Sequence, residues 1–362
     1  MSLLIFILVL GVLVLVHEWG HFFAARRFGI RVDEFGFGFP PRVWGKKFGE
    51  TLYSLNMFPI GGFVRIFGEQ GEGDGDKTSF ASHPIWHRVL VIAAGVLMNV
   101  ALAWVLFSFG HIVGIPSIAD GDPEVSDAQV TIISVADGSP AAEAKLAFGN
   151  VVKRVVSEYK SIEPKTSREL IEFVNSHRGE VLKLEVKESA AVKTDKMVTV
   201  TIKSRDTPPA GQGPIGIALA DIGIAQSPWY LAPWRGLETL WFSVRATGEA
   251  FWGLARGVVT KGAIPEGVSG PLGLFVLTGQ AQRLGFSYFL QFMAILSINL
   301  AILNIIPFPA LDGGRLLFLG IEKIRGKPVR ISYERAAHAI GFVLLLALIL
   351  VISYRDLYRF FL

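Results

Sequence analysis

Residues 3–21 of this chain read LLIFILVLGVLVLVHEWGH, an apolar run without a charge that leads directly into a His-Glu-x-x-His motif. On a helix, His17 and His21 lie four residues apart on one face, where both imidazoles can hold one zinc ion. Glu18 between them can take a proton from a zinc-bound water. A helix that crosses a bilayer needs about 20 apolar residues, and this run supplies most of them. The stretch predicts a hydrolytic metal site inside a membrane-spanning helix.

The composition of the whole chain agrees with a membrane protein. Its 362 residues are 51% hydrophobic and 18% charged, with a mean hydropathy of +0.46, whereas soluble domains carry roughly 25% charged residues. The net charge of +4 gives no indication of nucleic-acid binding. The chain has no cysteine, so it has no disulfide framework, and any zinc must be held by His, Asp or Glu.

Four segments are long and apolar enough to span a bilayer, at about 3–25, 89–113, 289–308 and 337–354. The first lacks the basic start and the cleavage site of a signal peptide, so we expect a retained helix. Lysine and arginine gather between the first two spans and between the last two. By the positive-inside rule these two loops are cytoplasmic, and the long segment 114–288 and both termini are extracytoplasmic.

The first cytoplasmic loop carries a pattern typical of strands. Polar and apolar residues alternate at Thr51–Asn56 and again at Phe63–Phe67. We expect a β-hairpin or small sheet here that dips toward the membrane. Gly61 and Gly62, between the two stretches, mark either a turn or a place where another part of the chain comes close.

The long segment between spans two and three divides into two parts. Residues 115–206 predict a small α/β domain, and residues 207–288 predict a linker with an amphipathic helix at about 233–260 that lies on the membrane surface. The membrane cores are then 1–114 and 289–362. Within the α/β domain we expect strands at 130–135, 151–156, 181–186 and 197–202, the last two as an antiparallel pair, and a helix at 167–178.

Two histidines are too few for catalytic zinc, which usually takes three protein ligands and one water. Asp312 follows the third span in the stretch Asn304–Gly314, where two prolines break the helix. Irregular backbone at membrane depth is tolerated only against protein or water. Asp312 is therefore either a further ligand or a helix cap at the cytoplasmic boundary of the membrane.

Together these residues resemble the site-2 protease family of intramembrane zinc metalloproteases. The matching motifs are His17-Glu18-x-x-His21, Gly95-x-x-x-Asn99 and Asn304-x-x-Pro307-x-Pro309-x-Leu311-Asp312-Gly313. Val268-Ser269-Gly270-Pro271 also resembles a family element, to which we attach no mechanism. The long insertion resembles the RseP-like bacterial branch, which carries PDZ domains there.

A single PDZ domain is expected in this chain. The segment Val130–Ala144 is similar to circularly permuted bacterial PDZ domains. Lys145-Leu146 and Gly149-Asn150 depart from the usual Gly-Leu and Gly-Asp, which puts a working peptide groove in more doubt than the fold. The expected fold is a mainly α-helical membrane protein with four transmembrane helices, a membrane-associated β-hairpin and this inserted extracytoplasmic α/β domain.

The resemblance implies a zinc endopeptidase. His17, His21 and Asp312 would bind Zn²⁺, and Glu18 would be the general base that activates water. The implied substrates are single-span membrane proteins, such as anti-sigma factors, and remnant signal peptides. The implied location is the bacterial cytoplasmic (inner) membrane, with the lipid bilayer and no nucleic acid as partner.

Four further residues are candidates for substrate binding. Asn304 and Asn99 would contact the substrate backbone, or else they are hydrogen-bonding residues between helices. An unwound substrate needs partners for its backbone, and a strand edge in the cytoplasmic loop supplies them. Gly61 and Gly62 would permit its close approach.

Two other functions remain open for a zinc site in this setting. One is a proteolytically inactive membrane zinc protein that scaffolds partners through its PDZ domain. Glu18 disfavours it, because a purely structural site has no use for a base. The other is a metal transporter, which needs a polar path through the helices, and spans two and four offer few polar groups to line one.

Overall fold

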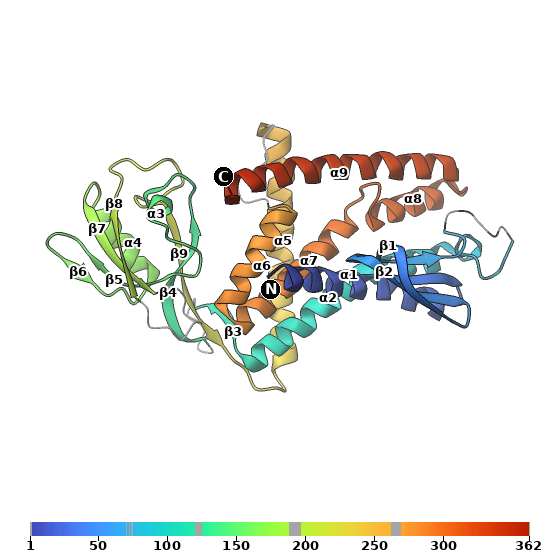
Figure 1. Cartoon of the computed structure of the whole chain (residues 1–362), viewed down its shortest axis with the longest axis horizontal. Helices are drawn as coiled ribbons and strands as arrows, with labels where there is room; N and C mark the ends of the chain where they lie inside the picture. Colours follow the sequence, from blue (N-terminus) through green and yellow to red (C-terminus); the bar gives the residue numbers. More distant parts are fainter. Residues whose placement is uncertain are drawn as a thin grey trace. The chain divides into compact units, whose positions relative to one another are not determined.

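The computed structural model describes residues 2–69, 71, 73, 75–119, 125–187, 197–261 and 269–361. They form two compact units (Figure 1). The first unit comprises Met1–Phe107, Gly236–Gly279 and Phe292–Leu362, and the second comprises Ser108–Arg235 and Gln280–Gln291. The first unit carries both metal motifs, so it is the one that positions the candidate site.

Within the described part of the chain, four helices are long and apolar enough to cross a membrane, as the sequence predicts. They are α1 (Ser2–Arg27), α2 (Ile85–Val113), α7 (Phe286–Ile305) and α9 (Ile331–Phe361). Many of their apolar side chains are exposed, including Leu4, Leu97 and Leu350. Exposed apolar side chains on such helices are suited to lipid rather than to water.

A close contact fixes α1 against α2. A Cβ atom on Gly20 of α1 would lie 2.3 Å from the carbonyl oxygen of Ala94 on α2. Only glycine lets the two backbones come this near, as is common where membrane helices pack. The contact is one residue from His21, so it also sets the position of the metal motif.

The first unit contains a small sheet of two long strands, β1 (Val32–Phe48) and β2 (Thr51–Ile66), which turn at Gly49-Glu50. Both strands bend. The two ends of β2 therefore pair with the first part of β1 from opposite sides. Phe35, for example, pairs with Val64 on one side and with Tyr53 on the other. The expected small sheet is therefore present, but its main partner strand, β1, was not predicted. The glycines and the Pro40-Pro41 pair within β1 are residue types depleted in strands, so its sequence gives no clear strand pattern.

Gly61 and Gly62 do not form the turn, which was one of the two expectations for them. They lie inside β2, and Gly62 pairs with Phe37. The alternative, a place of close approach, is confirmed. A Cβ on Gly62 would meet Gly36 O at 3.2 Å and Glu18 Cγ at 3.5 Å. The sheet therefore passes directly over the His-Glu-x-x-His helix.

The third span is broken where the prolines predict. α7 ends at Ile305, and α8 (Asp312–Arg325) begins after a six-residue segment that contains Pro307 and Pro309. A Cβ on Gly313 would lie 2.1 Å from Ile306 O, and one on Gly314 would lie 2.4 Å from Phe308 O. The paired glycines thus let α8 start tightly against the broken end of α7.

The second unit contains a seven-stranded sheet with two short helices. The strand order is β3-β9-β4-β5-β7-β8, with β6 beside β5. The strands are β3 (Ile115–Ile118), β4 (Val125–Val135), β5 (Val151–Val156), β6 (Ser161–Ile162), β7 (Val181–Lys187), β8 (Met197–Lys203) and β9 (Ile217–Ala225), and the helices are α3 (Pro140–Glu143) and α4 (Ser167–Ser176).

The core of this unit is apolar and continuous. It includes Ile132, Leu170 and Leu184, all fully buried. The predicted strands and the antiparallel pairing of β7 with β8 are confirmed. Strand β9 lies past residue 206, the expected end of the domain, yet pairs with both β3 and β4. The sheet therefore includes part of the expected linker, and its assignment as a PDZ domain stays a prediction.

The described residues also form the helices α5 (Ala232–Lys261) and α6 (Pro271–Leu284) and the short 3-10 helix η1 (Phe80–Ser82). α5 covers the expected surface helix and exposes Trp234, Trp241 and Trp252. Asp356 of α9 accepts hydrogen bonds from the backbone N–H groups of Gly270 and Gly273 at 2.9 and 2.7 Å. The Ser269-Gly270-Pro271 part of the unexplained motif thus forms the capped start of α6, and Val268 lies outside the described residues.

Candidate metal centre

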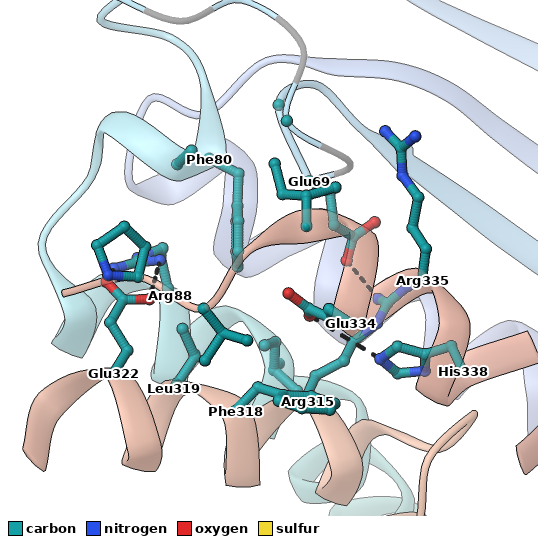
Figure 2. A pocket seen from close by; sticks show the side chains of 17 residues that line it. Glu69, Phe80, Arg88, Arg315, Phe318, Leu319, Glu322, Glu334, Arg335 and His338 are labelled. Atoms are coloured by element: carbon teal, nitrogen blue, oxygen red, sulfur yellow. Dashed lines mark hydrogen bonds and ion pairs between the residues drawn. The ribbon is translucent and has the colours of Figure 1, made fainter. Parts of the chain in front are cut away.

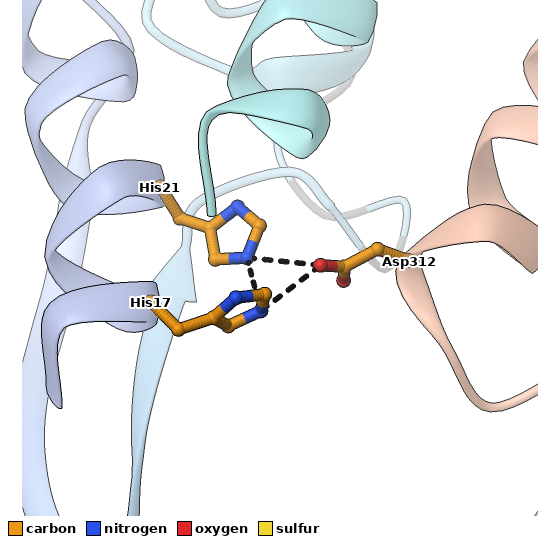
Figure 3. Close-up of side chains that lie close together, drawn as sticks. All are labelled: His17, His21 and Asp312. Atoms are coloured by element: carbon orange, nitrogen blue, oxygen red, sulfur yellow. Dashed lines mark hydrogen bonds and ion pairs between the residues drawn. The ribbon is translucent and has the colours of Figure 1, made fainter. Parts of the chain in front are cut away.

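Three potential ligand atoms converge in the first unit. Asp312 Oδ2 lies 3.0 Å from His17 Nε2 and 3.2 Å from His21 Nε2, and the two imidazole nitrogens are 3.2 Å apart (Figure 3). Both histidines are buried, and Asp312 is largely so. Among the described residues, this is the only group of three or more His, Cys, Asp or Glu side chains close enough to share a metal ion.

The local structure explains how these side chains meet. His17 and His21 come from successive turns of α1 and so point the same way. Asp312 is the first residue of α8, where the helix dipole favours a negative charge. Its Oδ2 atom thus brings a carboxylate oxygen beside both imidazoles, where it can share a cation with them.

Gly95 of α2 makes room for the two imidazoles. A Cβ at this position would lie 2.4 Å from His21 Nε2 and 2.8 Å from His17 Cε1. Any larger residue would push the histidines out of their present positions. The first glycine of the Gly95-x-x-x-Asn99 motif is thus explained by space rather than by contact with a substrate.

The backbone of α2 fixes the tautomer of His21. Its Nδ1 lies 2.9 Å from the carbonyl oxygen of Val91. A carbonyl oxygen can only accept a hydrogen bond, so Nδ1 carries the proton and Nε2 presents its lone pair toward His17 and Asp312. Metal-binding histidines are commonly oriented through their other nitrogen in this way.

Asn99 plays the same part for His17. Its side-chain amide lies 3.2 Å from His17 Nδ1, and its other amide atom is buried with no hydrogen-bond partner. An amide can present either its oxygen or its nitrogen here. With the oxygen toward His17, it accepts the Nδ1 proton and leaves Nε2 free to bind a metal. Asn99 is fully buried.

The three ligand atoms fit a zinc ion. Zinc bonded to nitrogen and oxygen at about 2.0–2.1 Å in a tetrahedron separates its ligand atoms by about 3.3 Å. The observed separations are 3.0–3.2 Å. Asp312 Oδ2 is also a buried atom without a hydrogen-bond donor. Two nitrogen lone pairs and a carboxylate oxygen this close repel one another unless a cation lies between them.

The other predicted residues surround this centre. Glu18 has both histidines and Asp312 as electrostatic neighbours, and the β2 backbone at Gly62 lies beside it. The Asn304 side-chain amide is 3.4 Å from His17 Nε2. Gly61 lies one residue further from Glu18 and is packed against Phe39. All the candidate site residues therefore fall in one region of the first unit.

Sequence reasoning missed several supporting groups. The Val91 carbonyl has no sequence signal, because any residue supplies one. Ser297 of α7 donates to Asn99 O at 2.8 Å and ties α7 to α2 at the level of the site. His338 on α9 contacts the chain beside Asp312. A lone histidine in the fourth span is the one signal that was available for it.

A cavity of about 290 Å³ adjoins the start of α8 (Figure 2). Its walls carry ion pairs between Arg315 and Glu69 and between Arg88 and Glu322. Arg315 lies one turn after Asp312 on α8. The cavity therefore has charged side chains set among largely apolar walls.

Comparison with known proteins identifies related sequences over almost the whole chain. The model of a family described as Peptidase family M50 matches residues 5–348. A Clostridium perfringens protein with the provisional name zinc metalloprotease CPE1693 is 32% identical over 361 residues, which cover 99% of this chain and 98% of that protein.

Longer relatives include several that carry the name RasP. The zinc metalloprotease RasP of Geobacillus kaustophilus is 29% identical over 448 aligned positions, and the regulator of sigma-W protease RasP of Bacillus subtilis is 28% identical over 446. Each alignment covers 100% of this chain and 99% of the relative. Because this chain has 362 residues, both relatives contain segments with no counterpart here.

Proposed function

This chain belongs to peptidase family M50, and on that premise we propose how its residues perform the intramembrane proteolysis of a zinc metalloprotease. His17, His21 and Asp312 hold the zinc ion, and Glu18 is the general base. The observation that carries this assignment is the convergence of three ligand atoms within 3.2 Å. On the far ring nitrogens, Val91 O accepts from His21, and the Asn99 amide can do the same for His17 when its oxygen is turned toward the ring.

The chemistry divides between the metal and one side chain. When bound, zinc supplies Lewis acidity toward the scissile carbonyl and toward water. The Glu18 carboxylate accepts the proton of the attacking water and passes it to the leaving amine. Its place next to the histidines on α1 suits it to both transfers.

An extended substrate segment lies along β2. A transmembrane helix must unwind before its carbonyls are accessible, and its freed backbone groups then need partners. Residues 62–66 of β2 pair with β1 on one side, and among the described residues no ladder partner occupies the other. Gly62 lies beside Glu18, so a strand added here passes close to the base. Asn304, near His17, contacts the substrate backbone.

The substrates are single-span membrane proteins. One relative is named a regulator of sigma-W protease, which supports anti-sigma-factor-like substrates, with remnant signal peptides as a further class. The enzyme lies in a bacterial cytoplasmic membrane, with both termini and the 115–206 domain outside the cytoplasm. The basic loops between spans support this orientation. The domain is a PDZ domain that captures peptides or excludes large substrates.

The catalytic assignment is tested with Glu18→Gln in membranes that contain a tagged single-span substrate. We expect cleavage to fall by about 10²–10⁴-fold, the usual contribution of a general base, with zinc content unchanged. A chelator should abolish cleavage by the wild type, and added zinc should restore it. Glu158→Gln, at an exposed position of the second unit, is the matched control. Equal cleavage by Glu18→Gln and wild type would refute the assignment.

The substrate path is tested by single proline substitutions over residues 61–66. Proline removes the backbone N–H that a paired substrate strand needs, so cleavage should drop while zinc content stays that of the wild type. The same scan over β8, in the second unit, serves as control. A scan over 61–66 in which every variant keeps full activity would rule the path out.

A further inference from the structure

The segment that presents Asp312 has an unusual backbone. Ala310, two residues before Asp312, has a φ of +82°, a conformation that costs free energy for any residue with a Cβ. It lies between the end of α7 at Ile305 and the start of α8. Such a conformation persists only where surrounding contacts enforce it. Something must therefore hold this residue in place.

His338 of α9 provides that contact. The Ala310 N–H donates a hydrogen bond to His338 Nδ1 at 2.9 Å. Nδ1 must then be the unprotonated nitrogen, and in the neutral ring Nε2 carries the hydrogen. Without this acceptor the Ala310 N–H would have no helix or strand partner, because the prolines have broken α7 just before it.

A second residue of α9 packs on the same segment. A Cβ on Gly341 would lie 2.3 Å from the carbonyl oxygen of Pro309. Gly341 is three residues after His338, so the two share one face of the helix. This face of α9 thus contacts Pro309 and Ala310 through one hydrogen bond and one close backbone approach.

The ring of His338 is itself held in position. It forms part of the cavity wall in Figure 2, with Phe318 at 5.8 Å between ring centroids and Glu334 Oε1 at 3.9 Å from Nε2. At the other end of α9, the buried Asp356 binds the start of α6. With both ends attached, α9 cannot slide along its axis without breaking one of these contacts.

We propose that His338 is a positioning residue for the metal site: by accepting the Ala310 N–H, it holds the backbone that directs Asp312 toward His17 and His21. The proposal rests on the assignment of Asp312 as a zinc ligand in the proposed function. The fourth span, α9, supplies none of the three candidate ligands, but through His338 it would raise the zinc affinity of the enzyme.

Near-isosteric variants of His338 separate the hydrogen bond from packing. In His338→Asn, Oδ1 lies the same number of bonds from the backbone as Nδ1 and can accept the same N–H. His338→Leu has a similar shape and no acceptor. Zinc affinity is measured on the purified full chain by competition with a chromophoric chelator, and the visible spectrum of the Co²⁺-loaded protein reports the ligand geometry.

We expect His338→Leu to bind zinc about 10–100-fold more weakly, the usual cost of losing a group that orients a ligand, with an altered Co²⁺ spectrum. His338→Asn should lie close to the wild type in both. Wild-type affinity in His338→Leu overturns the proposal. Equal weakening in both variants also overturns it, because packing alone would then be responsible.

Two further variants keep the result interpretable. Gly341→Ala displaces the same segment through Pro309 and should also weaken zinc binding, whereas Gly253→Ala, a position with open space on α5, should not. If neither Gly341→Ala nor His338→Leu changes the affinity, the proposal is wrong. Asp312→Ala tests the ligand assignment by itself: unchanged affinity there refutes the proposed function, whatever the His338 variants do.

Discussion

At the residue scale, the candidate centre depends on which nitrogen of each imidazole carries the proton. Val91 O accepts from His21 Nδ1, and the Asn99 amide lies against His17 Nδ1. Both contacts come from α2, from residues eight positions apart in this helix. They leave the two Nε2 atoms as bases that face Asp312. The second span thus orients ligands that are all located on other elements.

The two asparagines near His17 should differ when each is replaced by leucine. Asn99→Leu removes the acceptor for the Nδ1 proton, so zinc affinity should fall by about 10–100-fold. Asn304→Leu should keep zinc affinity and reduce cleavage, because its amide lies on the Nε2 side of the ring, where substrate approaches. Chelator competition and a cleavage assay on each variant measure the two effects separately.

The opposite pattern would reverse the two roles. Zinc loss only in Asn304→Leu would make that residue the one that orients His17. If neither variant changes zinc affinity or cleavage, both asparagines only link helices, which is the alternative that the sequence leaves open.

At the element scale, the break between α7 and α8 brings the third potential ligand, Asp312, to the candidate site. The prolines end α7 at Ile305, and the chain returns into a helix at Asp312. Gly313 and Gly314 then allow α8 to start against the carbonyl groups of the broken turn. A continuous helix would carry residue 312 away from α1, because each residue adds about 1.5 Å of rise. The irregular segment is therefore a structural requirement of the metal centre.

Alanine substitutions in α8 test this requirement. Gly313→Ala places a Cβ 2.1 Å from Ile306 O, so the start of α8 must shift, at a cost of about 1–3 kcal/mol in stability. Zinc content should fall with it. Gly320→Ala, on the same helix with open space around it, should be neutral or raise stability by up to about 1 kcal/mol. Thermal unfolding and metal analysis measure both quantities, and similar behaviour of the two variants would count against the tight α7–α8 junction.

At the scale of the whole molecule, the distribution of basic residues along the chain predicts its orientation in the membrane. The basic residues of the loops between α1 and α2 and between α7 and α9 are predicted to be cytoplasmic. The sheet of the second unit is predicted to lie outside. With α1, α2, α7 and α9 as spans, the even number of crossings places both termini on the same side.

The absence of cysteine makes this topology simple to test. Tyr159→Cys, at a site 84% exposed in the second unit, should react with a membrane-impermeant maleimide in spheroplasts. Ile324→Cys, at a site 87% exposed at the end of α8, should react only after the membrane is permeabilised. Reaction of Ile324→Cys in intact spheroplasts, with Tyr159→Cys protected, would show that the orientation is inverted.

The sequence by itself determined the features that depend on local pattern. Apolar runs located the four spans, because a bilayer demands a continuous apolar length. The four-residue spacing placed His17 and His21 on one face, and alternating apolar residues located the strands β7 and β8. Pro307 and Pro309 marked the break in the third span, because proline lacks the backbone N–H that a helical hydrogen bond needs.

Only the tertiary structure decided which distant groups meet. It placed Asp312 Oδ2 against both histidines, the geometry that the proposed ligand role needs, and it showed a close approach rather than a turn at Gly62. It also brought β9 into the sheet and His338 against Ala310. Each of these depends on hydrogen bonds and packing between segments far apart in the chain. Residue periodicity reports which face of an element is buried, but it does not report what buries it.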